Sequence, residues 1–352
     1  MTKKIWIEIL TPKQVMFFGR LLEKCRERGY ETVVTSRDYS EVNKVRDRYG
    51  IDAEVVGEHG GSTLSGKLSA GLERAEKLQE IVESEQPDVA VYLSSPDAAR
   101  VSFGLGIESI SVNDIPEAEA QSKLTVPISS RVACPKCIPK KVFTEYGISE
   151  DRVVQYDALD PIAWLKDFKP DEKILNELDI DSEKPLITFR TMETKASYLK
   201  EEKKVNFLVP IIKEISEKID AQIVVLSRYN QEEEIKKELS DDITVTNYVS
   251  QPQSLLYYSD VFVGAGGTMS LEAGLLGTPT LSCRPIDTYY ERHAKKEGLI
   301  EHVEKGNETE KIIHMLEKNG KYKKELRKTA ERLKKEMESP IDVLMETIEE
   351  LV

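Results

Sequence analysis

Short apolar runs of strand length alternate with amphipathic helical segments along most of this 352-residue chain, and that alternation restricts it to the α/β class. Strands that are joined by helices run parallel, so we expect parallel sheets with helices on both faces. Helical patterns such as Lys13–Arg28 and Leu64–Glu83 separate the expected strands of the first half. These strands are Ile5–Leu10, Thr32–Thr35, Glu54–Val56, Val89–Leu93, Glu108–Val112, Arg131–Cys134 and Arg152–Gln155.

The same alternation resumes after a charged stretch that contains Asp160–Pro161, Lys169–Pro170 and Lys184–Pro185. The expected strands there are Leu186–Arg190, Gln222–Leu226, Ile243–Thr246, Val261–Gly264 and Thr278–Ser282, and the expected helices are Val205–Lys218, Gln231–Leu239, Pro252–Tyr258 and Ser270–Leu276. We therefore predict two Rossmann-like domains, residues 1–160 and 185–325, joined by a linker, 161–184. A helical tail, 326–352, is expected to pack back across the domains. A single larger α/β domain with insertions is the alternative.

Composition narrows the classes of partner and the compartment. The net charge of −13 argues against a general affinity for nucleic acid or for anionic membranes. The first apolar run, Ile5–Leu10, is too short for a signal peptide or an integral membrane segment. Four cysteines do not make a disulfide framework, so we expect a cytoplasmic protein. Cys134 and Cys137 form a lone CxxC without further ligands nearby, so no metal site is expected. A homodimer is allowed, but the sequence does not specify the oligomeric state.

The segment Val261–Cys283 carries the most chemistry. An apolar strand ends in Gly264-Ala265-Gly266-Gly267, and a helix starts at about Thr268. Gly266 and Gly267 let the backbone approach a ligand, and the free N–H groups of a helix start favour phosphate. Thr268 and Ser270 are candidates to cap that helix or to donate a hydroxyl to phosphate, and Glu272 is a candidate to accept both ribose hydroxyls. The alternative is an ordinary strand–helix turn with Thr268 as its cap and Glu272 in solvent.

Gly266-Gly267-Thr268, Glu272 and Gly277-Thr278-Pro279 together resemble the nucleotide-sugar site of GT-B fold proteins. These include the lipid II-forming N-acetylglucosaminyltransferase and the non-hydrolysing UDP-N-acetylglucosamine 2-epimerases. In those families a Glu seven residues before the Pro holds the ribose, as Glu272 stands seven before Pro279. The preceding segment Tyr248–Asp260 also fits their pattern, and by resemblance its loop passes near the base.

A second resemblance is closer. The segments Ile9–Phe18 (ILTPKQVMFF) and Ser95–Arg100 (SPDAAR) are similar to an archaeal and bacterial family known as a domain of unknown function, which is placed beside the GT-B enzymes. Both resemblances imply a GT-B-like α/β fold, in which two Rossmann-like domains face a cleft that binds a nucleotide-activated sugar.

Candidate acids and bases follow strands of the first half. Asp114 follows Glu108–Val112 closely and, with Glu119, is a candidate for a carboxylate pair in which proximity raises one pKa. The alternative is that these are ordinary acids on a helix surface. In the epimerases, acids at a comparable strand end and in a Glu-x-Asn-Arg-x-Leu segment act on the sugar. Glu119–Leu124 resembles that segment, with Gln and Ser in place of Asn and Arg. His59, in the glycine-rich loop after Glu54–Val56, is a candidate general base, and its alternative is an exposed loop histidine.

Arg190 and Lys195 follow the first strand of the second domain and are candidates to neutralise a diphosphate leaving group. The epimerases carry a His-Arg-x-Glu-Asn motif near this place. Here Arg190 is followed by Glu193, and the histidine is missing, which counts against ordinary epimerase chemistry.

Three functional hypotheses follow. The first is a metal-independent GT-B glycosyltransferase that needs no cofactor. Its second domain holds a UDP-sugar as substrate, its first domain holds an unknown acceptor, and Asp114 or His59 acts as the base. The second is an epimerase of nucleotide sugars, resembling the UDP-N-acetylglucosamine 2-epimerases. The third is a non-catalytic nucleotide-sugar-binding protein, since a fold alone does not fix function.

Overall fold

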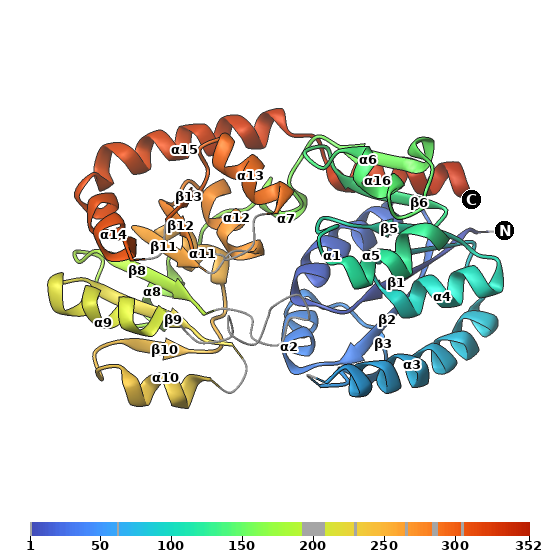
Figure 1. Ribbon diagram of the computed structural model, residues 1–352, viewed down its shortest axis with the longest axis horizontal. Coiled ribbons are helices and arrows are strands. Elements are labelled where there is room, and N and C mark those ends of the chain that lie inside the picture. Colours follow the sequence, from blue (N-terminus) through green and yellow to red (C-terminus); the bar gives the residue numbers. More distant parts are fainter. Residues whose placement is uncertain are drawn as a thin grey trace. The chain divides into compact units, whose positions relative to one another are not determined.

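The computed structural model describes residues 2–61, 63–191, 208–228, 231–264, 267–283, 288–303 and 306–352. The chain divides into two compact units, which we call the first unit (Met1–Trp164 with Met337–Val352) and the second unit (Leu165–Glu336). Each unit contains one parallel β-sheet with helices beside it (Figure 1). The two α/β units that the strand–helix alternation predicts are therefore confirmed.

The first unit has a seven-stranded sheet in the order β3-β2-β1-β4-β5-β6-β7. Its strands are β1 (Lys4–Ile9), β2 (Glu31–Asp38), β3 (Glu54–Glu58), β4 (Val89–Leu93), β5 (Glu108–Val112), β6 (Arg131–Pro135) and β7 (Val153–Tyr156). Its α-helices are α1 (Pro12–Glu27), α2 (Ser40–Tyr49), α3 (Leu64–Glu85), α4 (Pro96–Leu105), α5 (Glu119–Thr125), α6 (Lys140–Thr144) and α16 (Pro340–Leu351). Two 3₁₀ turns, Val126–Ile128 and Glu150–Arg152, and the short helix α7 (Ile162–Leu165) complete the described elements up to the second unit.

Three helices of the first unit begin with a hydroxyl residue followed by proline. The side chains of Thr11, Ser95 and Ser339 each accept a hydrogen bond from a first-turn backbone N–H, and a proline opens the helix after each of them. This combination satisfies one free donor and supplies a preset φ, so the helix start is encoded locally.

Helix α16 completes the core of the first unit although it lies at the end of the chain. Its buried residues include Leu344, Met345 and Ile348. The sulfur of Met345 lies 3.9 Å from that of Cys25 in α1, and Glu349 forms an ion pair with Arg28 at 2.8 Å. The chain therefore enters the second unit and returns.

The second unit repeats the topology with a six-stranded sheet in the order β10-β9-β8-β11-β12-β13. Its strands are β8 (Leu186–Arg190), β9 (Gln222–Leu226), β10 (Thr244–Thr246), β11 (Val261–Gly264), β12 (Thr280–Ser282) and β13 (Glu301–His302). Its described helices are α8 (Lys173–Glu177), α9 (Leu208–Lys218), α10 (Glu232–Glu238), α11 (Pro252–Tyr258), α12 (Thr268–Leu275), α13 (Tyr289–Lys296), α14 (Glu308–Glu317) and α15 (Asn319–Glu336).

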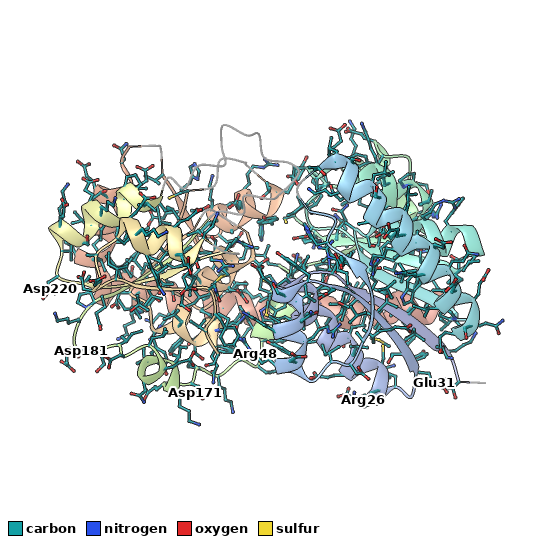
Figure 2. All side chains as sticks on the ribbon, turned by 90° about the horizontal axis from the view of Figure 1, so that it is seen from below. Arg26, Glu31, Arg48, Asp171, Asp181 and Asp220 are labelled. Carbon is teal, nitrogen blue, oxygen red and sulfur yellow. The ribbon has the colours of Figure 1, made fainter. Side chains whose placement is uncertain are left out.

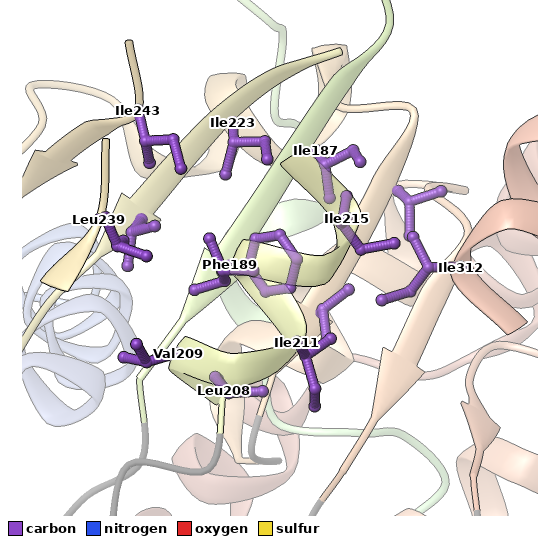
Figure 3. Packing of buried hydrophobic residues seen from close by; sticks show 14 of the residues in the cluster. Ile187, Phe189, Leu208, Val209, Ile211, Ile215, Ile223, Leu239, Ile243 and Ile312 are labelled. Atoms are coloured by element: carbon purple, nitrogen blue, oxygen red, sulfur yellow. The ribbon is translucent and has the colours of Figure 1, made fainter. Parts of the chain in front are cut away.

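Apolar side chains of the sheet and of α9 form the core on one face of the second unit. Phe189 of β8 lies against the side chains that α9 directs at the sheet, among them Leu208, Ile211 and Ile215 (Figure 3). The apolar positions of α9 recur at helical spacing, so this face is readable from the sequence.

The segment before β8 belongs to the second unit. Ile174 of α8 is buried in a cluster with Leu186 and Val224 of the sheet. Asp181 N–H donates to Gln222 Oε1 at 2.8 Å, and Lys184 forms an ion pair with Asp220 at 2.9 Å. Asp181 and Asp220 accordingly lie at one edge of this unit (Figure 2). Among the described helices of the whole chain, none combines the length and apolar character that a membrane span requires.

Two glycines end helices of the second unit in the same way but have different surroundings. Gly277 follows α12 with φ +74°, and Gly298 follows α13 with φ +72°. In both turns the next residue donates its N–H to a helix carbonyl, Thr278 to Ala273 at 3.0 Å and Leu299 to Ala294 at 2.9 Å. A Cβ at Gly277 would lie 2.5 Å from the Cα of Arg327 in α15, whereas a Cβ at Gly298 would meet no described atom within 4 Å.

We therefore predict that Gly277→Ala destabilises the protein more than Gly298→Ala. The Gly298→Ala variant bears only the left-handed backbone cost of about 1 kcal/mol. Gly277→Ala bears that cost and also displaces α15, which adds roughly 1–3 kcal/mol. Urea denaturation of both variants measures the difference, and equal costs would show that the contact of α12 with α15 contributes nothing.

Candidate functional site

In open parallel sheets, ligands bind beyond the carboxyl ends of the strands, where the strand order reverses. In the second unit that point lies between β8 and β11, whose last residues, Arg190 and Gly264, are register partners. Helix α12 begins directly beyond β11. Gly264 and Gly267, the described ends of the predicted glycine-rich segment, therefore lie at the reversal of the second sheet.

The N-terminus of α12 presents backbone N–H groups without a side-chain cap. Gly267 is the N-cap residue, with φ 87° and ψ −162°. Thr268 is the first helical residue, so its expected role as the cap is wrong: the cap position needs the positive φ that glycine supplies. Gly266, the other glycine selected, lies outside the described residues. The first-turn N–H groups of a helix have no partner within the helix, and together with the helix dipole they suit this end for an anion.

Ser270 lies in the first turn of α12 and is fully buried. Its Oγ has no hydrogen-bond partner within the described part of the chain. A Cβ at Gly264 would lie 2.9 Å from that oxygen, so the hydroxyl sits beside the end of β11. Buried hydroxyl groups normally have a partner, so the position of Ser270 fits a group that donates to a ligand.

Arg190 ends β8 on the other side of the reversal. Its Nη1 donates to the backbone carbonyl of Ser227, just beyond β9, at 2.9 Å. This contact fixes part of the guanidinium at the carboxyl end of the sheet. Lys195, its predicted companion, lies outside the described residues.

Glu272 lies one turn along α12 and is 1% exposed. Its Oε1 accepts a hydrogen bond from Gln253 Nε2 of α11 at 2.8 Å. The alternative of a solvated residue at this position is therefore wrong, because α11 covers it.

A second buried acid lies on the same side of the second sheet. Glu291 of α13 accepts hydrogen bonds from Ser282 Oγ at 3.0 Å and from Thr288 Oγ1 at 3.4 Å. The sequence analysis did not select Glu291.

Asp114 in the first unit pairs with a lysine. Lys13, at the start of α1, forms ion pairs with Asp114 at 2.5 Å and with Asp160 at 2.6 Å. Tyr156 donates its hydroxyl to Asp160 at 2.7 Å. We call these four residues the Lys13 cluster. Lys13 follows β1, Asp114 follows β5, Tyr156 is the last residue of β7, and Asp160 follows β7.

Charge determines the protonation of the Lys13 cluster. Burial by itself lowers the pKa of Lys13, but Asp114 and Asp160 outweigh burial, and the net pKa is raised. Burial raises the pKa of Asp160, and the positive charge of Lys13 opposes that increase. The pKa of Tyr156 is raised by burial and by the neighbouring Asp160. The cluster therefore holds a fixed ammonium between two carboxyl groups.

The predicted carboxylate pair of Asp114 with Glu119 is wrong. Glu119 is an exposed residue of α5 whose carboxylate pairs with Lys123 one turn away. The hydrogen bond and charge of Lys123 lower the pKa of Glu119, opposite to the shift expected for a carboxylate pair. Helical i,i+4 spacing explains this outcome, because it offers Glu119 a nearer partner of opposite charge.

His59 lies beyond β3 and stacks on Tyr39, with ring centroids 5.1 Å apart. The guanidinium of Arg37, at the end of β2, lies over the ring of Tyr39, 5.6 Å from the ring centre. His59 is half-buried, so the alternative of a simply exposed loop histidine does not describe it.

A group of four charged residues, which we call the Arg74 cluster, lies at the reversal of the first sheet. Arg74 of α3 is 2% exposed and forms ion pairs with buried Glu8 of β1 and, at 3.4 Å, with Asp97 of α4. Arg37 is its fourth member. Burial and then Glu8 raise the pKa of Asp97 to about 6, and Arg74 opposes this shift.

The CxxC cysteines are free thiols. Burial raises the pKa of Cys137 to about 12 and also raises that of Cys134, so both remain protonated and weakly nucleophilic at neutral pH. Within the described residues, no group of three or more His, Cys, Asp or Glu side chains is placed to hold a metal ion.

The sequence contains signals for the residues that the analysis missed. Glu8 interrupts the apolar run Ile5–Leu10, and Arg74 lies four and eight residues before the buried Leu78 and Val82, on the same helix face. A charge at such positions indicates a buried ionic group. Lys13 follows the end of β1 within a few residues, as Asp114 follows the end of β5.

The raised pKa of Asp97 makes a prediction about stability. Between about pH 4 and pH 6 the folded protein holds a proton that the unfolded chain releases, so Asp97 lowers stability progressively as pH rises through this window. Asp97→Asn removes this loss and stabilises the protein at pH 7 by at most about 3 kcal/mol relative to the wild type. Denaturation of the wild type and of Asp97→Asn at pH 4 and pH 7 measures this stabilisation. An equal gain in stability at both pH values would contradict the raised pKa of Asp97.

Solved structures share this fold at low sequence identity. UDP-GlcNAc 2-epimerase from Neisseria meningitidis, solved bound to UDP-GlcNAc, is 16% identical with a TM-score of 0.76, covering 99% of this chain and 100% of that one. The Methanocaldococcus jannaschii UDP-GlcNAc 2-epimerase, solved with UDP-GlcNAc and UDP, is 18% identical with a TM-score of 0.70, covering 94% and 98%. Spinosyn forosaminyltransferase SpnP is 15% identical with a TM-score of 0.67, covering 99% of each chain. The predicted GT-B-like fold class is thereby confirmed.

Sequence comparison gives the family. "Uncharacterized protein MJ0665" from Methanocaldococcus jannaschii is 32% identical over 355 residues, which cover 98% of this chain and 97% of that protein. The model of the family described as "Protein of unknown function (DUF354)" matches residues 3–352. The two-unit chain with the glycine-rich α12 start and the Lys13 and Arg74 clusters therefore belongs to the DUF354 family.

Proposed function

We propose that this protein is a glycosyltransferase that uses a nucleotide sugar, of the UDP-sugar class. The observation that carries the proposal is the start of α12. There a helix N-terminus that no described side chain caps, a buried serine hydroxyl without a partner in the described chain, and Arg190 meet at the strand-order reversal of the second sheet. Backbone N–H groups, a hydroxyl and a guanidinium together form a site for a diphosphate.

The residues of the second unit receive separate roles in this proposal. The α12 N-terminus and Ser270 bind phosphate oxygens, and Arg190 with Lys195 neutralises the charge that builds up on the departing diphosphate. Glu272 accepts the ribose hydroxyls in exchange for its hydrogen bond from Gln253. The proposal thus assigns charge neutralisation to the protein's own cations and helix dipole, and it requires no metal ion or cofactor.

The first unit supplies the acceptor side of the reaction. As the acceptor hydroxyl attacks the anomeric carbon of the sugar, its proton must pass to a base, and the bond from that carbon to the diphosphate breaks. Asp114, held by Lys13, is the proposed base, and His59 is the other candidate. The ion pair with Lys13 holds the Asp114 carboxyl group in place beyond the end of β5.

Epimerisation of a nucleotide sugar is the second candidate function. Two of the solved structures with this fold are UDP-GlcNAc 2-epimerases that were solved with UDP-GlcNAc. That reaction needs acids and bases about the sugar and no acceptor. The pairing of Glu119 with Lys123, and the absence from the sequence of a histidine directly before Arg190, favour transfer over epimerisation.

Isothermal titration with UDP-, GDP-, CMP- and dTDP-sugars tests the nucleotide site. We expect one class to bind and Ser270→Ala to weaken it by about tenfold, because one hydrogen bond to a charged group is lost. The same substitution should not lower stability, since Ser270 Oγ has no partner to lose in the described chain. Glu272→Gln should weaken the binding of nucleotides, whose ribose hydroxyls it contacts in the proposal, but leave the binding of inorganic diphosphate unchanged.

Glu234→Gln, an exposed change on α10, is the matched control and should bind like the wild type. Failure of all four nucleotide classes to bind would refute the nucleotide-sugar site. When one class binds, NMR of the incubated sugar separates the functions: an epimer appearing without acceptor indicates the epimerase, and transfer that is lost in Asp114→Asn indicates the transferase. Binding with neither reaction supports a non-catalytic role.

A further inference from the structure

We propose that Arg37 and Arg74 of the first unit form a binding site for an oxyanion, a carboxylate or phosphate group carried by the second substrate. All residues of this site belong to the first unit, whereas the proposed nucleotide site is made of residues of the second unit. Only its assignment to the sugar acceptor rests on the proposed function.

The strand register places the charged groups on one face of the first sheet. Glu8 of β1 is the register partner of Thr35 in β2, and Arg37 follows Thr35 by two residues, so it projects from the same face. Trp6 marks this face, because its Nε1 donates to Thr35 Oγ1 at 2.8 Å. Trp6 also packs with Leu78 of α3 and Ala98 of α4. Helices α3 and α4, which carry Arg74 and Asp97, therefore cover the face that carries Glu8 and Arg37.

Arg74 has donor capacity that the described protein does not use. Its Nε donates to the carbonyl of Val56 at 2.9 Å, and its Nη1 donates to Glu8 and to Asp97. Its Nη2 is buried and has no hydrogen-bond partner among the described residues. A buried guanidinium donor that lacks an acceptor is costly, so the arrangement favours an acceptor from outside the chain.

Arg37 provides a second, more accessible guanidinium. It is half-buried, and its Nε likewise has no hydrogen-bond partner in the described chain. Burial and then the positive charge of Arg74 lower the pKa of Arg37, so the two guanidinium groups repel each other. An oxyanion between them removes that repulsion and accepts from both, which is the geometry that arginine provides for carboxylates and phosphates.

The backbone beside the Arg74 cluster is also unusual. Ser94, in the turn from β4 to α4, has φ 46°, a left-handed value that is uncommon for serine. Backbone strain of this kind is concentrated at ligand sites. The Ser94 hydroxyl donates to the carbonyl of Val112 at 3.2 Å, which fixes the turn that carries Asp97.

Asp97 makes the site sensitive to pH. The charged and titratable groups that face the guanidinium pair are Glu8 of β1, Tyr39 after β2, His59 after β3 and Asp97 of α4. Ionised Asp97 competes with an incoming anion for Arg74, and protonated Asp97 does not. Anion binding is therefore tighter below about pH 6, the pKa of Asp97.

Sulfate tests the site, because it remains a dianion from pH 5 to pH 8. Isothermal titration of the full-length protein should show a sulfate site that Arg37→Gln weakens about tenfold or more. Arg48→Gln, which removes an exposed arginine of the neighbouring helix α2, is the matched control for net charge and should change nothing (Figure 2). Asp97→Asn should tighten sulfate binding at pH 8 and remove the difference between pH 5 and pH 8.

The Asp97→Asn result separates an effect on binding from an effect on folding. If the role of Asp97 were purely structural, its replacement would not increase the affinity for sulfate. Sulfate binding that is unchanged by both Arg37→Gln and Asp97→Asn would overturn the proposal. Ser270→Ala reports independently on the α12 site, so the failure of one site is distinguishable from the failure of the other. Competition of sulfate by glucuronate or by glucose 6-phosphate then identifies the carboxylate or the phosphate as the preferred group.

Discussion

In each sheet the strand order reverses at a central pair of strands, β1 and β4 in the first unit and β8 and β11 in the second. The helices that follow the two strands of such a pair pack on opposite faces of the sheet, so no connecting helix covers the backbone where these strands end. The chain must satisfy the exposed groups there with side chains or with a ligand. In the first unit Gln14 bridges the two strands, accepting from the N–H of Leu10 at 2.6 Å and donating to the carbonyl of Leu93 at 3.3 Å. In the second unit Arg190 and the N-terminus of α12 occupy the equivalent place. The polar residues of both candidate sites follow from this single constraint.

The two units meet the constraint with different chemistry. The second sheet offers backbone N–H groups, hydroxyls and Arg190, and its buried acids Glu272 and Glu291 accept hydrogen bonds from an amide and from a hydroxyl. The first sheet offers side-chain charges, in the Lys13 cluster and in the Arg74 cluster. Backbone donors bind phosphate whatever molecule carries it, whereas paired buried charges discriminate by protonation and geometry. A general nucleotide site on one unit and a selective site on the other is consistent with this division.

The fold was predictable because the strand and helix patterns are local. Val89–Leu93, Glu108–Val112 and Leu186–Arg190 have the predicted bounds, whereas the two residues of β13 were too few to give a pattern. The placement of α12 beyond β11 was predictable for the same reason. Pairings between charges were not. Glu119 and Asp114 are near in sequence, but each takes a lysine, and the lysine of Asp114 lies 101 residues away. Such choices depend on which strand ends are neighbours, and one-dimensional spacing does not contain that information.

The return of the chain to the first unit also affects the order of folding during synthesis. Leu165–Glu336 is one continuous segment, so the second unit has its complete sequence while the ribosome is still active. The first unit has segments on both sides of that one and lacks α16 until Pro340–Leu351 has been translated, so the apolar surface that Leu344, Met345 and Ile348 cover stays open until then. Of the two units, the one that is started first is therefore finished last, and the nascent chain carries its incomplete core during the synthesis of the whole second unit.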